Sequence, residues 1–219
     1  MKKLTIRDSE WIAFFIVLLS FAAALYLFYF YPGLPARFAS HWNAAGQVNG
    51  YVSKFWGLFL EPLISLVLLI TFLIIPKVDP LKENIAKFRN YFDTFVLLIM
   101  IFLFYLYALT IFWNIGHRFN MIVTLVPAFA VLFLYAGILV ENAKQNWFIG
   151  IRTPWTLSNE AVWNKTHKLG GQLFKASGLA ALFGIVFQNY AILFVILPVI
   201  LTAIYAVIYS YVEYQKIGR

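Results

Sequence analysis

The sequence has no cysteine and little charge. Only 12% of its 219 residues are Asp, Glu, Lys or Arg, where a soluble domain has about 25%. The lack of cysteine excludes disulfides, cysteine-ligated zinc and a thiol nucleophile. Hydrophobic residues make up 63% of the chain and the mean hydropathy is +0.80. The composition therefore predicts an integral membrane protein, for which lipid is the main solvent.

Acidic residues are also scarce. Nine Asp and Glu against 17 Lys and Arg give a net charge of +8. Such a balance can indicate nucleic-acid binding, but in a membrane protein Lys and Arg more often set the orientation and contact anionic headgroups. We therefore expect the basic residues to contact membrane lipids, and we expect no direct contact with nucleic acid.

Six apolar runs are long enough, or nearly so, to cross about 30 Å of hydrocarbon as helices of about 20 residues. None alternates apolar with polar residues as a membrane barrel strand does. The sequence thus predicts an all-α fold, a polytopic six-helix transmembrane bundle forming a single domain over residues 1–219. The first run is too long for a signal peptide, so we expect an uncleaved anchor. The expected spans cover residues 11–31, 55–75, 92–115, 121–140, 173–187 and 191–212.

Basic residues are distributed unevenly between the loops. With a cytoplasmic N-terminus, 14 of the 17 Lys and Arg fall in cytoplasmic segments, and Arg37, Lys54 and Arg118 are the exceptions. The positive-inside rule then predicts a cell-membrane protein with both termini in the cytoplasm. Residues 32–54 become an outer loop and residues 141–172 a cytoplasmic one.

The expected outer loop combines turn residues with aromatic ones. Pro32, Gly33 and Pro35 oppose a helix, so the pattern favours a compact loop. Aromatic and charged side chains in this loop, or on its side of the membrane, are candidates for binding a ligand. These candidates are Arg37, His41, Trp42, Glu61 and Arg118.

Glu61 is the unusual member of this set because it lies inside the second span. Its Cα is about 9 Å along the helix from Phe55, at about 1.5 Å per residue. Pro62 follows it and disfavours helical geometry at Glu61. A carboxylate at this depth needs a water-filled cavity, an ion pair with Arg37 or Arg118, or a path along which it extends to the interface.

Glu61 could also join His41 and His117 in a zinc site of two imidazoles and one carboxylate, as some hydrolases have. The three residues lie in separate segments, and no HExxH spacing is present. We therefore expect His41 to be a hydrogen-bonded loop residue. The sequence predicts no metal, no other cofactor and no catalytic motif, so we expect a protein that is not an enzyme.

The expected cytoplasmic loop contains a basic, tryptophan-rich segment, residues 146–174. Pro154 stops a preceding helix, and Thr156 or Ser158 can cap a new one. We expect a short amphipathic helix over about residues 158–171 that lies at the membrane surface and runs into the fifth span. One stripe of it is expected to face protein: Glu160, Trp163, Asn164, His167 and Gly171. A second stripe is expected to face headgroups: Lys165, Lys168, Gln172 and Lys175.

Several side chains of this segment are candidates for a structural or partner-binding role. Acidic and amide residues at the cytoplasmic helix ends, Asp79, Asp93, Glu141 and Asn142, are their expected partners. A polar network that holds the loop to the bundle is favoured over a ligand site. The candidates are Arg152, Trp155, Glu160, Trp163, Asn164 and His167.

Two motifs together resemble a known family. Residues 150–171, GIRTPWTLSNEAVW followed by KTHKLGG, resemble the signature of the SdpI (sporulation-delaying-protein immunity) family. Residues 34–54, LPARFASHWNAAGQVNGYVSK, resemble the membrane-associated domain of unknown function that often precedes it. The resemblance implies an immunity protein of a bacterial or archaeal cell membrane that protects against a secreted, membrane-active peptide toxin. It also implies, more weakly, a protein that sequesters an ArsR-type repressor at the membrane.

Two other functional classes stay open on the sequence alone. A small-molecule or peptide transporter needs a substrate path, for which Glu61 and prolines inside the spans are the only indications. A metal-dependent membrane hydrolase needs the outer His and Glu residues to meet. The resemblance favours the immunity protein over both.

The orientation can be tested because single cysteines are clean labels in a cysteine-free chain. We expect Asn49→Cys to react with a membrane-impermeant maleimide added to intact cells, since residue 49 lies in the predicted outer loop. Permeabilised cells provide the control. Reaction only after permeabilisation would show that the predicted orientation is inverted.

Overall fold

The computed structural model describes residues 8–217 and has six helices long and apolar enough to cross a membrane within that range. They are α1 (Asp8–Phe30), α2 (Lys54–Val78), α4 (Arg89–Asn114), α5 (Met121–Asn142), α7 (Glu160–Ala181) with α8 (Phe183–Val186), and η1 (Gln188–Tyr190) with α9 (Ala191–Gln215). Shorter elements are β1 (Arg37–Trp42), β2 (Val48–Ser53), α3 (Lys82–Lys87) and α6 (Pro154–Ser158). The predicted six-span helical fold is confirmed. The terminal basic residues used for the orientation lie outside the described range: Lys2, Lys3, Arg7 and Arg219.

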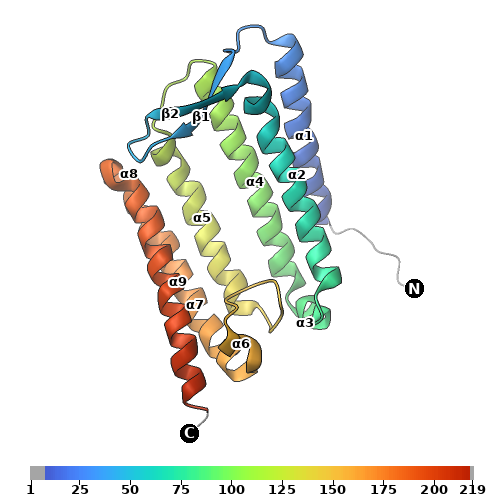
Figure 1. Cartoon of the computed structure of the whole chain (residues 1–219), viewed down its shortest axis with the longest axis vertical. Helices are drawn as coiled ribbons and strands as arrows, with labels where there is room; N and C mark the ends of the chain where they lie inside the picture. The colour runs from blue at the N-terminus through green and yellow to red at the C-terminus, as the bar shows by residue number, and fades with distance from the viewer. Residues whose placement is uncertain (1–7, 218–219) are drawn as a thin grey trace, which may run out of the picture. The chain divides into compact units, whose positions relative to one another are not determined.

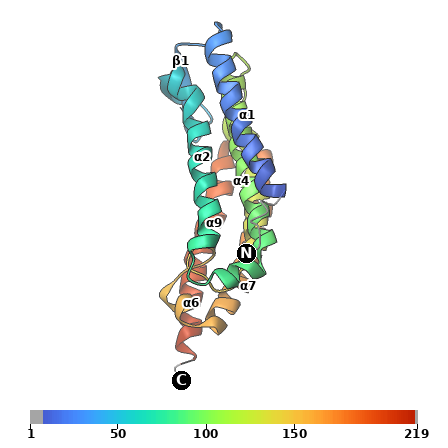
Figure 2. The same ribbon diagram turned by 90° about the vertical axis from the view of Figure 1, so that its right-hand side faces the viewer.

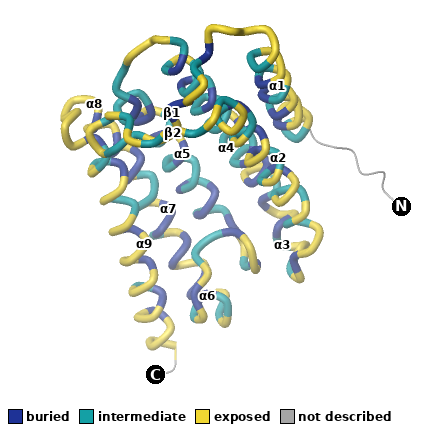
Figure 3. The backbone as a smooth tube through the Cα atoms, turned by 45° about the horizontal axis from the view of Figure 1, so that its top comes forward, coloured by how far each residue is buried: buried dark blue, intermediate teal, exposed yellow. Residues whose placement is uncertain are grey.

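The spanning helices expose much of their apolar surface. The buried residues of α1, for example, form one stripe of small side chains, Ala13, Val17, Ser20 and Ala24, while Phe15 on another face is 65% exposed. In α9, too, exposed residues outnumber buried ones along the helix, as Figure 3 shows. Apolar surface of this extent is unfavourable in water and favourable in hydrocarbon. The chain is therefore a multi-pass membrane protein.

The described residues form two compact units. The first contains residues 8–72 and 96–125, and the second contains residues 73–95 and 126–217. Three helices, α2, α4 and α5, each contribute residues to both units. Each unit has its own packed interior and its own candidate site.

In the first unit, the loop expected over residues 32–54 forms an antiparallel hairpin of β1 and β2. The turn between the strands is closed by Asn43, whose side-chain oxygen accepts from the backbone N–H groups of Ala45 and Gln47, both at 3.0 Å. Gly46 has a φ of +76°, which glycine adopts without strain. The expectation of a non-helical loop holds, but the strands were not predicted. Their pairing shifts register on both sides of His41, which obscures the alternating pattern.

The hairpin is fixed to α1, α2 and α4, which lie together in this unit (Figures 1 and 2). Phe38 of β1 is fully buried in a cluster with Ala24, Leu58 and Tyr107. The side chain of Asn114 on α4 accepts from the Ala39 N–H at 2.8 Å and donates to the Ala39 carbonyl at 3.0 Å. Asn114 thus pairs with the backbone of β1 as a neighbouring strand would, which satisfies buried groups that have no water.

In the second unit, α7 packs against both α5 and α9 (Figure 1). Gly171 and Gly178 of α7 let α5 approach closely, since a Cβ on Gly178 would lie 2.8 Å from the Ala130 carbonyl oxygen. On the α9 side, the hydroxyls of Ser177 and Thr202 are hydrogen bonded at 3.0 Å. Small residues and paired hydroxyls therefore hold this three-helix group together.

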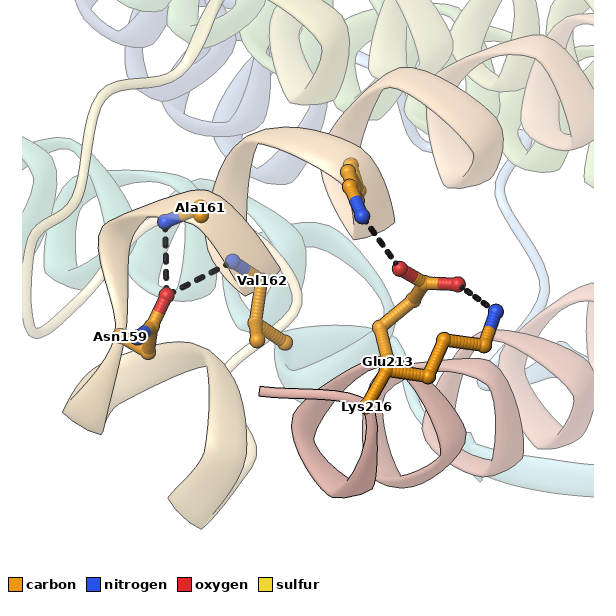
Figure 4. Close-up of polar contacts among 6 residues, drawn as sticks. Asn159, Ala161, Val162, Glu213 and Lys216 are labelled. Carbon is orange, nitrogen blue, oxygen red and sulfur yellow. Dashed lines mark hydrogen bonds and ion pairs between the residues drawn. The ribbon is translucent and has the colours of Figure 1, made fainter. Parts of the chain in front are cut away.

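The start of α7 differs from the sequence-based expectation. Asn159 caps it, accepting from Ala161 N and Val162 N, and neither Thr156 nor Ser158 is the cap (Figure 4). Thr153 and Thr156 instead form a capping box on the preceding α6. The predicted surface helix over residues 158–171 is the first half of α7, which continues without a break to Ala181.

The lysines of α7 also differ from the expectation that they all face headgroups. The Lys165 ammonium donates to Glu213 of α9 at 2.7 Å, and the same carboxylate accepts from Lys216 at 2.5 Å (Figure 4). Lys175 pairs with Glu141 of α5 at 2.6 Å. Lysines 165 and 175 therefore join helices, whereas Lys168 is exposed as predicted.

The close packing of α5 and α7 predicts that Gly178→Val destabilises the fold. The added side chain meets backbone atoms of α5, which cannot move aside, and overpacking of this kind costs about 1–3 kcal/mol. Thermal unfolding of the purified protein in detergent measures the effect. Ala176→Val is the matched control, because residue 176 on the same helix is exposed. Equal melting temperatures for the two variants would contradict the close approach.

Candidate functional site

The first unit contains a cavity of about 380 Å³ between the hairpin and the helices. Its walls are mainly apolar and come from both strands, α2, α4 and α5; Leu60, Ile64, Leu106 and Leu125 are among them. Small-molecule pockets in proteins hold about 300–1,000 Å³ and combine apolar walls with a few placed polar groups. The cavity has the size and composition of a binding site.

Three side chains that line the cavity each have a buried polar atom without a hydrogen-bond partner. Glu61 uses Oε1 to accept from the Ser65 hydroxyl at 2.5 Å, but its buried Oε2 has no partner. Tyr107, 2% exposed, leaves its hydroxyl unpaired, and Trp42 leaves its indole Nε1 unpaired. In residues 8–217 the only other buried side-chain nitrogen or oxygen without a partner is the hydroxyl of Thr166. Since buried polar groups are nearly always paired, three orphans in one cavity indicate a place for a ligand.

Helical geometry at Glu61 sets the direction of its carboxylate. α2 continues through Glu61 and Pro62, although Pro62 disfavours helical geometry at the residue before it. Leu58, Pro62 and Ser65 are buried on one face of α2, and this packing outweighs the local preference of the residue before proline. Ser65 therefore lies one turn beyond Glu61 and can hold its carboxylate.

The structure places two of the predicted binding residues outside the cavity wall. The Arg37 guanidinium lies over the Tyr51 ring, 5.2 Å from its centroid. The Arg118 guanidinium lies 3.6 Å from the Trp113 ring centroid and donates to the Trp113 carbonyl at 2.8 Å. Neither forms the ion pair with Glu61 that was one of the alternatives for it, because Arg37 lies over a ring and Arg118 binds a ring and a backbone carbonyl instead. His41, Trp42 and Glu61 do meet at the cavity.

The three residues considered for zinc do not come together. His41 Nδ1 lies 2.5 Å from the Asn49 side-chain oxygen, as expected of a hydrogen-bonded loop residue. His117 is exposed and packs its ring against Phe112 instead of lining the cavity. Over residues 8–217 no three His, Asp or Glu side chains are grouped so that they could hold a metal ion.

The second unit contains the tryptophan-rich segment, whose centre is a stacked pair. The rings of Trp163 and His167 are buried, with centroids 3.8 Å apart and planes within 15°. Trp163 Nε1 donates to the Ala143 carbonyl at 2.8 Å. His167 Nε2 accepts from the Ile151 N–H at 3.0 Å, so the proton on Nδ1 donates to the Trp163 carbonyl at 2.9 Å. The pair thus ties α7 to the loop before α6, with histidine in one neutral tautomer.

The loop of residues 143–153 is held from within by Asn146, which sequence analysis did not identify. Asn146 is fully buried, accepts from the N–H groups of Phe148 and Ile149, and donates to the carbonyls of Lys144 and Ile149. Asp79 fixes the same loop by accepting from Trp147 N at 2.9 Å. The only signal in the sequence was an asparagine just after a helix end, which is common in turns.

Of the predicted protein-facing stripe, Trp163, His167 and Gly171 are buried, but Glu160 and Asn164 are exposed. The buried side of α7 is shifted toward Val162 and Thr166 instead. The expected polar contacts are also different. Arg152 is exposed and donates to the Trp147 carbonyl, Asp93 pairs with Arg89 and Glu141 with Lys175. Trp155, half buried, packs its ring against Tyr211 with centroids 5.1 Å apart.

Two sequence families match different parts of the chain. Residues 142–210 match the SdpI/YfhL protein family, and residues 15–66 match a domain of unknown function, DUF1648. The chain is 26% identical over 208 residues to the immunity protein SdpI of Bacillus subtilis (strain 168), which covers 94% of this chain and 96% of that protein. No solved structure matches the chain. The DUF1648 match includes Trp42 and Glu61, and the SdpI/YfhL match includes the Trp163–His167 pair.

The buried position of Trp163 predicts that Trp163→Ala greatly lowers the amount of folded protein. The substitution leaves a cavity and an unpaired Ala143 carbonyl, and truncating a buried tryptophan costs about 3–5 kcal/mol. Trp147→Ala, at a residue 51% exposed, is the control and should have little effect. Size-exclusion chromatography and thermal unfolding in detergent measure both. Wild-type stability of Trp163→Ala would contradict a structural role for the stacked pair.

Proposed function

We propose that the chain is an immunity protein that protects its cell against a secreted, membrane-active peptide, because it matches the SdpI/YfhL protein family over residues 142–210 and resembles an immunity protein along most of its length. The observation that carries this proposal is the similarity to an immunity protein over 94% of the chain. The match extends through both units, so the part with the cavity and the part with the tryptophan-rich segment both have counterparts in that relative.

The cavity supplies the binding step of this proposal. A membrane-active peptide acts after it partitions into lipid, and a site inside a spanning unit can bind it there. Apolar walls replace the lipid around such a peptide, while Trp42 and Glu61 fix its position, as buried aromatic and charged anchors do at interfaces. The bound peptide is withdrawn from the pool that can assemble in the membrane. The chain then acts by binding and needs no catalytic group.

Orientation decides from which side the peptide arrives. With the hairpin outside, as the distribution of Lys and Arg predicts, Arg37 and Arg118 lie on the side from which a secreted peptide approaches. Both are exposed, so they are accessible to the peptide before it reaches the cavity. This arrangement gives the five predicted binding residues two successive roles, with the exposed arginines first and the cavity residues second.

The tryptophan-rich segment suits a second role, the binding of a protein partner such as an ArsR-type repressor on the cytoplasmic side. It is held firmly by Asn146 and Asp79, yet it exposes Trp147, Phe148 and Arg152. A rigid loop with exposed aromatic and arginine side chains is typical of a protein-binding surface. The transporter and hydrolase alternatives have less support, since the cavity walls are mainly apolar and no metal-binding group forms in residues 8–217.

We expect Trp42→Ala and Glu61→Gln to weaken protection without lowering the amount of protein in the membrane. Truncating a central anchor typically costs about 2 kcal/mol or more, so the tolerated peptide concentration should fall at least about tenfold. The measurement is survival of a sensitive host that expresses the chain, challenged with a panel of amphipathic peptides, with membrane abundance determined in parallel. Trp11→Ala, at a lipid-exposed residue, and Glu83→Gln, at an exposed one, are the matched controls.

The paired measurement separates the alternatives. Loss of protein together with protection would show that Trp42 and Glu61 are structural. Full protection by both variants at normal abundance would place peptide binding outside the cavity. Failure of the wild-type chain, at normal abundance, to protect against any peptide of the panel would contradict the immunity function.

A further inference from the structure

We infer that the cavity binds the free N-terminus of an apolar peptide, with the α-ammonium group on Glu61 and the first carbonyl on Trp42. The inference rests on the proposed function, because it names the part of the peptide that enters the site. It depends on three side chains that line the cavity and have an unpaired polar atom, and on the apolar residues around them.

Within residues 8–217, the carboxylate of Glu61 has no ion pair with a Lys or Arg side chain. No Lys or Arg is among the residues that line the cavity. The basic residues of the hairpin region have other partners: Arg37 lies over Tyr51, Arg118 binds Trp113, and Lys54 donates to the Phe28 carbonyl at 3.1 Å. A buried carboxylate without a counter-ion is costly, and a cation that arrives with a ligand offsets this cost. The charge of the site therefore selects a cationic group.

The other two orphan groups restrict the kind of cation. Trp42 Nε1–H can only donate, so it needs an acceptor such as a carbonyl, whereas the Tyr107 hydroxyl can donate or accept. The first residue of a peptide presents an ammonium group and a carbonyl oxygen separated by two bonded carbons. A free N-terminus therefore offers an ammonium group to Glu61 and a carbonyl to Trp42, and the Tyr107 hydroxyl can pair with either. A lysine side chain brings the ammonium group without a carbonyl beside it, and an acetylated N-terminus brings no charge.

The size and walls of the cavity restrict the part of the peptide next to its ammonium group. Most of the wall is apolar, with Leu60, Ile64, Leu106 and Leu125 among its residues, so it favours apolar side chains at the start of the peptide. A volume of about 380 Å³ is at the small end of the range for ligand sites. The cavity is thus suited to the terminal residues of a peptide, while the rest of the peptide stays in lipid or along the hairpin.

Three short probes test the inference on the purified full chain in detergent. They are Leu-Leu-Leu-amide with a free N-terminus, its N-acetylated form, and N-acetyl-Leu-Leu-Lys-amide, whose only amino group is on the side chain. Binding is measured by titration calorimetry and by tryptophan fluorescence. We expect the free N-terminus to bind at least about tenfold more tightly than the acetylated form, because truncating one partner of a buried charged pair strongly weakens binding. The lysine probe should fall between the two.

Variants assign the preference to the cavity. Glu61→Gln keeps the size of the side chain and should bring the ratio between free and acetylated probes close to one. Tyr107→Phe removes a single oxygen and should reduce the ratio. Glu83→Gln changes the net charge by the same amount as Glu61→Gln at an exposed site, and should preserve the ratio. Thermal unfolding confirms that each variant is folded; if Glu61→Gln does not fold, Tyr107→Phe alone decides.

Equal binding of the free and acetylated probes by the wild-type chain, or tightest binding of the lysine probe, would overturn the inference. An unchanged ratio in both cavity variants would overturn it as well. These outcomes are distinct from failure of the proposed function. A wild-type ratio near one, together with loss of protection in Trp42→Ala cells, leaves the immunity function standing. A tenfold ratio without any protection of cells contradicts the immunity function and leaves the ligand assignment standing.

Discussion

Buried polar groups have no water to pair with, and this constraint determines the structure of each unit. In the first unit a short hairpin can be buried against helices only because the Asn114 side chain pairs with both backbone groups of Ala39. In the second unit a loop between two spans is kept in one conformation because Asn146 and His167 satisfy its backbone groups. Side-chain amides and one imidazole thus replace the water that would solvate such segments elsewhere.

The cavity is where this constraint is not met. Glu61, Tyr107 and Trp42 come from α2, α4 and β1, they line the same cavity, and each has one buried polar atom without a partner. The surrounding structure has to stabilise this arrangement, because each orphan group costs free energy in the absence of a partner. Ser65 supports Glu61 by binding its other oxygen, which fixes the carboxylate without neutralising it. Such an arrangement suits a preorganised binding site, for which the proposed immunity function would supply the ligand.

The two parts of the chain that match known sequence families have different physical characters. The DUF1648 match contains the hairpin and the parts of α1 and α2 against which it packs. It also contains Trp42 and Glu61, each of which has a polar atom without a partner in the chain. The SdpI/YfhL match contains side chains that are mostly paired with their own backbone, such as Trp163 and His167. The motif of residues 150–171 has a recognisable sequence because several of its contacts need a particular residue type: aromatic rings for the stacked pair, asparagine for the cap of α7, and glycine for the close contact with α5. Gly150, for example, has a φ of +113° against the His167 ring, a conformation that other residues rarely adopt.

The sequence by itself determined the class of this protein and the number of its spans, because crossing hydrocarbon as a helix needs only length and apolar composition. It also singled out Glu61 as a charge that needs an explanation, and it identified Trp163 and His167 on one face of a helix through their spacing of four residues. Only the tertiary structure decided what those residues do. The partners of Glu61 depend on where β1 and α4 lie, and the partners of Arg37 and Arg118 are aromatic rings close to them in sequence or across the hairpin. Hydrophobic patterning specifies which residues avoid water, but hydrogen-bond partners depend on distances between elements far apart in the chain, which spacing along the sequence does not contain.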